Sequence, residues 1–78
     1  MKRYIFKYKH NDKEYYWCID DNNNDMLVSN NRFAKLFTEK EVTILDLDNS
    51  FSIGDELWLD DLNDYIVLET KLIKVRIS

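Results

Sequence analysis

The run Tyr65–Ile77, YIVLETKLIKVRI, constrains the fold more than any other stretch of this 78-residue chain. It is rich in β-branched and aliphatic residues and holds no Gly or Pro, which is typical of a strand that crosses a small sheet. Its apolar residues change parity along the run, with Ile66, Leu68 and Leu72 on one face and Ile73, Val75 and Ile77 on the other. A strand whose buried face changes side needs a bulge or a bend. We therefore predict a bend at residues 71–73, with the first half in a hairpin with the segment around Trp58 and the second half beside the N-terminal strand.

The N-terminal segment predicts a β-hairpin. Residues 3–9 alternate aromatic and basic side chains with the period of a half-buried strand. Turn-forming residues follow at His10–Lys13, and Glu14–Ile19 reads as the returning strand. Both faces of that second strand are partly apolar, so it is either sandwiched or offers an aromatic face to a partner.

The centre of the chain predicts a loop and a short helix. Residues 20–25, DDNNND, favour an exposed loop. Met26–Val28 fits either a short strand or the entry to a helix. Ser29 is an N-cap candidate for a helix at Asn30–Phe37, whose apolar residues have helical spacing, and Val28 with Phe33 would form a hydrophobic staple.

The next segment gives two conflicting signals. Residues 38–41, TEKE, have the pattern of a capping box and favour a helix that continues through Val42, whereas the β-branched residues of Val42–Leu47 favour a strand. We predict the strand. After a turn at 48–50, Phe51 and Ile53 are expected to contact the core, and Gly54 predicts a tight turn. Leu57 and Leu59 should then face the core and Trp58 the opposite side, and residues 60–64 should form a loop or a hairpin connection.

These elements predict an α+β fold in the order β-β-α-β-β-β. The expected architecture is a small curled, mostly antiparallel sheet, or an open barrel of about five strands, with one short helix. One domain spanning 1–78 is expected from the length. A chain this short buries only about 60 to 65 % of its unfolded surface, so its core must be compact. No segment has the run of about 18 apolar residues that a membrane helix needs, and the first ten residues lack the features of a secretion signal. The single cysteine, Cys18, has no partner for an internal disulfide, so we expect a soluble protein of the cytoplasm.

The net charge of −4 is unevenly distributed along the chain. Residues 20–70 carry thirteen acidic side chains and only three basic ones, whereas residues 1–19 and 71–78 are both net positive. If the first and last strands are neighbours, the folded molecule should have a basic pole and an acidic pole.

The sequence offers weak evidence for catalysis or metal binding. The acidic loop at 20–25 lacks the glycine and the glutamate that a calcium-binding loop requires at its sixth and twelfth positions. His10 and Cys18 are the only residues of their types and have no evident third partner, and a single glycine excludes a phosphate-binding glycine loop. We therefore expect no catalytic residues, no metal and no other cofactor, and a protein that is not an enzyme.

A surface for binding a basic partner protein is the function that we favour. The acidic residues of the centre fall near predicted strand ends and turns, where they could form one rim that attracts a basic surface. An outward tryptophan within such a rim is a plausible binding hot spot; the equal alternative is a Trp58 that covers a sheet edge under the helix. The partner-binding residues that we predict are Trp58, Asp55, Glu56, Asp60, Asp61 and Asp64. The chain would then be a small non-enzymatic interaction module, for example an accessory or inhibitory protein; alternatively, these charges only keep the domain soluble.

Binding of single-stranded nucleic acid is the alternative function. Aromatic rings and cations on the N-terminal hairpin would provide base stacking and phosphate contacts, from Lys7, Lys9, Lys13, Tyr16 and Trp17. The rings and cations of the first strand point to opposite sides, however, and the pI of about 4.8 opposes phosphate binding. A homodimer formed through Tyr16 or the last strand is a further alternative.

Overall fold

The computed structural model describes residues 1–60 and 64–78 and contains a sheet of seven strands with one short α-helix and two single-turn 3-10 helices. The elements are β1 (Arg3–His10), β2 (Lys13–Ile19), β3 (Asp25–Val28), η1 (Asn31–Phe33), β4 (Phe37–Thr38), α1 (Glu39–Ile44), η2 (Leu47–Asn49), β5 (Glu56–Leu59), β6 (Asp64–Val67) and β7 (Ile73–Arg76).

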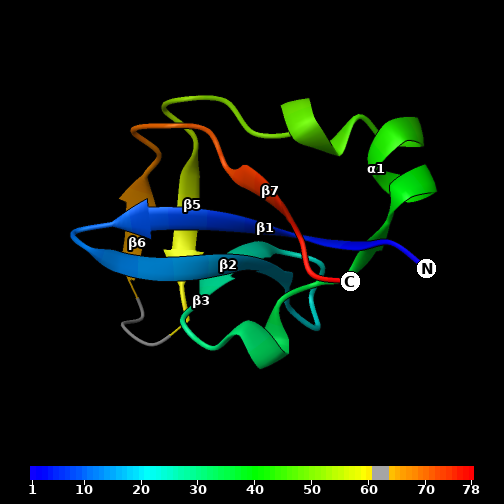
Figure 1. The fold of residues 1–78 in the computed structure, drawn as a ribbon. Helices are drawn as coiled ribbons and strands as arrows, with labels where there is room; N and C mark the ends of the chain where they lie inside the picture. The colour runs from blue at the N-terminus through cyan, green and yellow to red at the C-terminus, as the bar shows by residue number, and fades with distance from the viewer. Residues whose placement is uncertain (61–63) are drawn as a thin grey trace.

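The strands form one curled sheet that does not close into a barrel (Figure 1). Its order is β4-β1-β2-β3-β5-β6, and β7 also pairs with β1. Neighbouring strands are antiparallel except β3 and β5, which run parallel with Met26 opposite Trp58. The expected small α+β fold is therefore confirmed, but the sheet is mixed and has seven strands instead of about five.

The predicted N-terminal hairpin is confirmed. β1 and β2 pair from Lys7 opposite Tyr16 to His10 opposite Lys13. The two turn residues, Asn11 and Asp12, both have positive φ values of 50° and 64°. This is the conformation of a type I′ turn, whose twist matches that of the flanking strands and which Asn and Asp tolerate well.

The C-terminal run divides into two strands with different partners. β6 pairs with β5, whereas β7 pairs with β1, with Tyr4 opposite Arg76. Between them, Leu68 and Leu72 are buried, and the hydroxyl of Tyr8 accepts a hydrogen bond of 2.8 Å from the backbone N–H of Glu69. The predicted break and the predicted partners of both halves are confirmed. The prediction of a single bent strand is wrong, because the run forms two separate strands. The segment between them is held by its buried leucines and by the Tyr8 hydroxyl.

The predicted helix at Asn30–Phe37 is wrong. Only the 3-10 turn η1 forms, capped by the Asn30 side chain and not by Ser29, and Phe33 is 63 % exposed, so it forms no hydrophobic staple. The backbone N–H of Lys35 donates to the carbonyl oxygen of Trp17 on β2. This bond holds the chain extended and brings Phe37 into the core, which ends any helix before it can continue.

The predicted strand at Val42–Leu47 is also wrong, because the capping box decides the conformation. The backbone N–H of Thr38 donates to the Glu41 carboxylate at 3.0 Å, and the N–H of Glu41 donates to the Thr38 hydroxyl at 3.1 Å. α1 follows from this cap and buries only Val42. No described strand lies along this segment, so its β-branched residues gain no sheet pairing.

An aromatic cluster forms the centre of the core, with Trp17 in its middle. The Trp17 ring stacks on Phe37 at 5.1 Å between centroids and meets Phe6 and Phe51 edge-on. Leu57 and Leu59 of β5 face this core, as predicted. Ile53 does not: its side chain is exposed, in contrast to our expectation, and it lies just before the turn at Gly54, where φ is +100°. No helix within residues 1–60 and 64–78 is long and apolar enough to span a lipid bilayer.

Candidate functional site: an acidic groove beside Trp58

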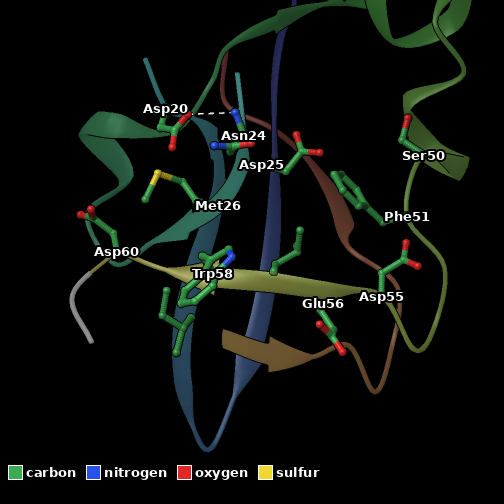
Figure 2. A pocket seen from close by; sticks show the side chains of 12 residues that line it. Asp20, Asn24, Asp25, Met26, Ser50, Phe51, Asp55, Glu56, Trp58 and Asp60 are labelled. Carbon is green, nitrogen blue, oxygen red and sulfur yellow. Dashed lines mark hydrogen bonds between the residues drawn. The ribbon is translucent and has the colours of Figure 1, made fainter. Parts of the chain in front are cut away.

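A groove of about 860 Å³ lies where the loop before β3, the strand β5 and the segment 50–55 meet (Figure 2). Its walls carry both carboxylate and apolar side chains. Its lining residues are Asp20, Asn24, Asp25, Met26, Ser50, Phe51, Asp55, Glu56, Leu57, Trp58, Leu59 and Asp60. No Lys or Arg belongs to this set, so the groove is strongly acidic.

The alternation of β5 turns Trp58 outward into this groove. Leu57 and Leu59 are buried, whereas Trp58 between them is 52 % exposed, as the sequence predicted. Across the sheet, Met26 of β3 and Tyr65 of β6 are its register partners. The Trp58 and Tyr65 rings lie 5.7 Å apart with an interplanar angle of 64°. The outer face of three adjacent strands therefore carries a continuous row of a thioether and two aromatic rings.

Three of the five groove carboxylates accept hydrogen bonds from the protein itself. Asp20 accepts from the backbone N–H groups of two loop residues, Asn22 and Asn24. Asp25 accepts from the indole N–H of Trp17 at 3.0 Å, and Asp55 accepts from the backbone N–H of Ser52 at 2.8 Å. These bonds fix the walls of the groove, because each joins a carboxylate to the backbone or the core.

Glu56 and Asp60, the other two carboxylates, are both exposed. They stand two residues before and two residues after Trp58: Glu56 begins β5, and Asp60 follows its last residue. Within the part of the chain that the structure describes, neither side chain has a hydrogen-bond or ion-pair partner. Trp58 is thus flanked by two negative charges that nothing in the described molecule neutralises.

The ion pairs of the described residues lie elsewhere. Most of them join cations of the N- and C-terminal strands to nearby carboxylates: Lys2 to Glu39, Lys7 to Glu14, Lys9 to Asp12 and Lys74 to Asp48. The lysines of β1 and β7 are therefore partly neutralised, whereas none of these ion pairs between described residues involves a groove carboxylate.

The structure brings most of the predicted partner-binding residues together. Trp58, Asp55, Glu56 and Asp60 all line the groove. Asp64 begins β6 opposite Leu59 and is not part of the lining. Asp61 lies outside the described residues.

The sequence interpretation missed the wall formed by residues 20–26. Asp20, Asn24 and Asp25 were considered only as an unmatched calcium loop, yet they face β5 across the groove. The cause is the parallel pairing of β3 and β5, which joins residues 32 positions apart, Met26 with Trp58 and Leu27 with Leu59. The acidic composition of the loop can be read from the sequence, whereas its position beside β5 cannot.

The alternative nucleic-acid-binding residues are placed on the hairpin but are largely engaged within it. Trp17 is only 5 % exposed, so its ring is unavailable for base stacking in this structure. Lys7 and Lys9 form ion pairs, and Lys13 lies over the Tyr15 ring at 5.3 Å. The pKa of Tyr16 is raised, first by burial and then by its hydrogen bond to the Glu14 carboxylate. Nucleic-acid binding stays a prediction that rests mainly on the lysines and the half-buried Tyr16.

His10 and Cys18 lie at opposite ends of the hairpin. His10 pairs with Lys13 at the turn and stacks on Tyr8, whereas Cys18 pairs with Met26 near the far end of β2. Five residues of extended strand separate Lys13 from Cys18, a span of about 16 Å. Among the described residues no group of three or more His, Cys, Asp and Glu side chains has the geometry of a metal site.

Comparisons of the chain with protein-family models, with curated proteins and with solved structures find no match.

Proposed function

We propose that this domain is a small non-enzymatic interaction module that binds a basic surface of another protein through the acidic groove, as an accessory or inhibitory protein would. One observation carries the proposal: five carboxylates line one groove together with a half-exposed tryptophan, and no Lys or Arg is among the described lining residues. We include Asp61 and Asp64 in the proposed surface, because they follow Asp60 in the chain. A cytoplasmic setting is part of the proposal, since the single cysteine suits a reducing compartment.

Charge and burial make separate contributions to such binding. Like charges in one groove raise its electrostatic energy, and a cationic partner removes that cost on docking. The negative potential accelerates the encounter, and salt weakens it. The indole of Trp58 adds apolar contact area, which is why tryptophans so often dominate binding energies. If the groove carboxylates served only solubility, they would not need to lie together in one groove beside an exposed tryptophan.

Capture of a partner by matched variants tests the charge mechanism. The wild-type protein and the double variant Glu56→Gln/Asp60→Asn are immobilised and exposed to a lysate of the source organism at low salt. We expect the wild type to retain a basic protein that the variant retains about tenfold less, which corresponds to about 1.4 kcal/mol. The same protein should be released at high salt.

A second double variant, Asp12→Asn/Glu39→Gln, controls for net charge. It also removes two carboxylates, but at exposed ion pairs outside the groove. This control should retain the partner as the wild type does. Equal retention by the groove variant would refute the proposed mechanism.

A titration with mixed-sequence single-stranded oligonucleotides at low salt tests the alternative. We expect no binding, because the lysines of the hairpin are paired and the groove repels phosphate. Binding that Lys7→Gln/Lys9→Gln abolishes, and that the groove variant keeps, would establish the nucleic-acid role instead.

A further inference from the structure

The exposed ring pair on β5 and β6 indicates what part of a partner the groove receives. We propose that Trp58 and Tyr65, with Glu56 and Asp60 beside them, form a seat for an arginine side chain of the partner protein. This inference rests on the proposed function, because it names the chemical group that the acidic groove would recognise.

The geometry of the two rings leaves contact area for a planar cation. Trp58 and Tyr65 are register partners whose rings meet at a steep angle, and they are 52 % and 47 % exposed. About half of each residue therefore stays accessible although the two rings contact each other. The negative face of an aromatic ring attracts a cation that lies within about 6 Å of the ring centroid.

The flanking carboxylates supply acceptors at both sides of the ring. Glu56 has the same parity on β5 as Trp58 and is displaced along the strand by about 6.6 Å, and Asp60 follows directly after the last residue of β5. Neither has an internal partner within the described chain. A guanidinium group has five N–H donors in one plane, so it can stack on the indole and donate to a carboxylate at its edge. A lysine ammonium is more strongly hydrated and has no planar face to stack, so arginine is the better fit.

The molecule's own cations do not occupy this seat. Three lysines make cation–ring contacts, all on other rings: Lys13 over Tyr15, Lys35 over Phe37 and Lys74 over Tyr4. Within residues 1–60 and 64–78, no Lys or Arg lies over Trp58 or Tyr65. Among the described residues, the Trp58–Tyr65 pair therefore has exposed rings and nearby carboxylates but no cation of its own. A cation from a partner can bind there.

Heteronuclear NMR provides a direct test, because the chain has only two indole N–H groups. The probes are blocked pentapeptides with arginine, lysine or citrulline between glycines. We expect the arginine peptide to shift the Trp58 indole signal and to leave the buried Trp17 signal unchanged. Its affinity should exceed that of the lysine peptide, and the citrulline peptide should produce no shift, because it lacks the charge.

Variants of the ring pair separate stacking from charge. Trp58→Leu and Tyr65→Leu keep all groove carboxylates and change exposed positions, so the fold should persist, which an unchanged Trp17 signal verifies. For Tyr65→Leu, the Trp58 signal reports binding; for Trp58→Leu, backbone amide shifts of β5 do. Each variant should bind the arginine peptide about fivefold more weakly.

The outcomes also distinguish this inference from the function on which it rests. Equal affinity for the arginine and lysine peptides, or unchanged affinity in Trp58→Leu, would overturn the arginine seat. The proposed function would still stand if partner capture depended on Glu56 and Asp60. A shift of the Trp58 signal on dilution without any peptide would assign the seat to a second copy of this chain, and would overturn it as well.

Discussion

Two tryptophans hold opposite positions in this molecule, and the difference defines their roles. Trp17 of β2 is enclosed by Phe6, Phe37 and Phe51, and its indole N–H is bound to Asp25. Trp58 of β5 contacts one ring at the surface and faces the groove. The first residue lies at the centre of the core, and the second is half exposed.

The same substitution at both positions should therefore have unequal effects on stability. Trp17→Phe removes part of the central ring and leaves Asp25 without its donor, so the free energy of unfolding should fall by about 1 to 3 kcal/mol. Trp58→Phe should change it by less than about 0.5 kcal/mol. Urea denaturation followed by circular dichroism measures both, since the fluorescence of each variant differs from that of the wild type. A loss of similar size in the two variants would contradict the assignment of Trp17 to the core.

At the scale of elements, α1 depends on its N-terminal cap more than on burial, because only Val42 of the helix is buried. Thr38→Ala removes the acceptor for the Glu41 N–H, and the free energy of unfolding should decrease by about 1 kcal/mol. Thr43→Ala is the matched control, because its hydroxyl only donates back to the carbonyl of Glu39 within the exposed helix. That control should be neutral or slightly stabilising, as measured by urea denaturation. Equal losses in the two threonine variants would show that the cap is not responsible.

The same cap makes α1 sensitive to acid. The pKa of Glu41 is lowered from its ordinary value of 4.5, first by the hydrogen bond from the Thr38 backbone and then by the Thr38 side chain. Because the pKa is lower in the folded state, this stabilisation is present above pH 4.5 and is lost as the pH falls through the folded-state pKa. Glu41→Gln should therefore lose less stability than the wild type between neutral pH and about pH 3. Denaturation curves at the two pH values test this; an identical loss in both proteins would be inconsistent with the cap.

The elements show where sequence patterns are sufficient and where they are not. The hairpin of β1 and β2 was predictable because alternation and turn residues act locally, and the parity change near Leu72 correctly marked the break before β7. The segment 38–47 was misjudged, since propensity favoured a strand while two specific cap hydrogen bonds stabilised a helix. The helix predicted around Phe33 failed because one long-range bond from Lys35 to Trp17 holds the chain extended.

The candidate site was predictable only in part for a related reason. The outward position of Trp58 and its acidic neighbours follows from alternation along one strand. The opposite wall, with Asp20 and Asp25, depends on the parallel pairing of β3 and β5. Parallel strands are joined by a long connection, so no pattern within a short stretch of the sequence predicts their pairing.

For the whole molecule, the unpaired groove carboxylates should lower stability. Their mutual repulsion is not relieved by any described ion pair. Glu56→Gln/Asp60→Asn should therefore raise the free energy of unfolding at low salt, by up to about 0.5 kcal/mol. Added salt should stabilise the wild type more than this variant, because salt screens a repulsion between carboxylates that the variant has already lost in part. Urea denaturation at low and high salt measures both effects.

The ion-pair variant Asp12→Asn/Glu39→Gln provides the contrast. Its two carboxylates face lysines, so their removal should leave stability unchanged or reduce it by less than about 1 kcal/mol. If both double variants changed stability by the same amount and in the same direction, net charge alone would explain the effect and the groove would have no special role.

The pairing of β1 with three strands has a consequence for biosynthesis. β1 is made first, yet the edge from Tyr4 to Lys7 is completed only when residues 73–76 of β7 have been added. At ordinary rates of translation, that edge stays open for about 3 to 13 seconds. An open edge invites pairing with other chains, and the positive charge of Lys7 at this edge opposes it. Nascent chains arrested before Ile73 should therefore remain sensitive to protease, and they should become resistant once β7 has left the ribosome.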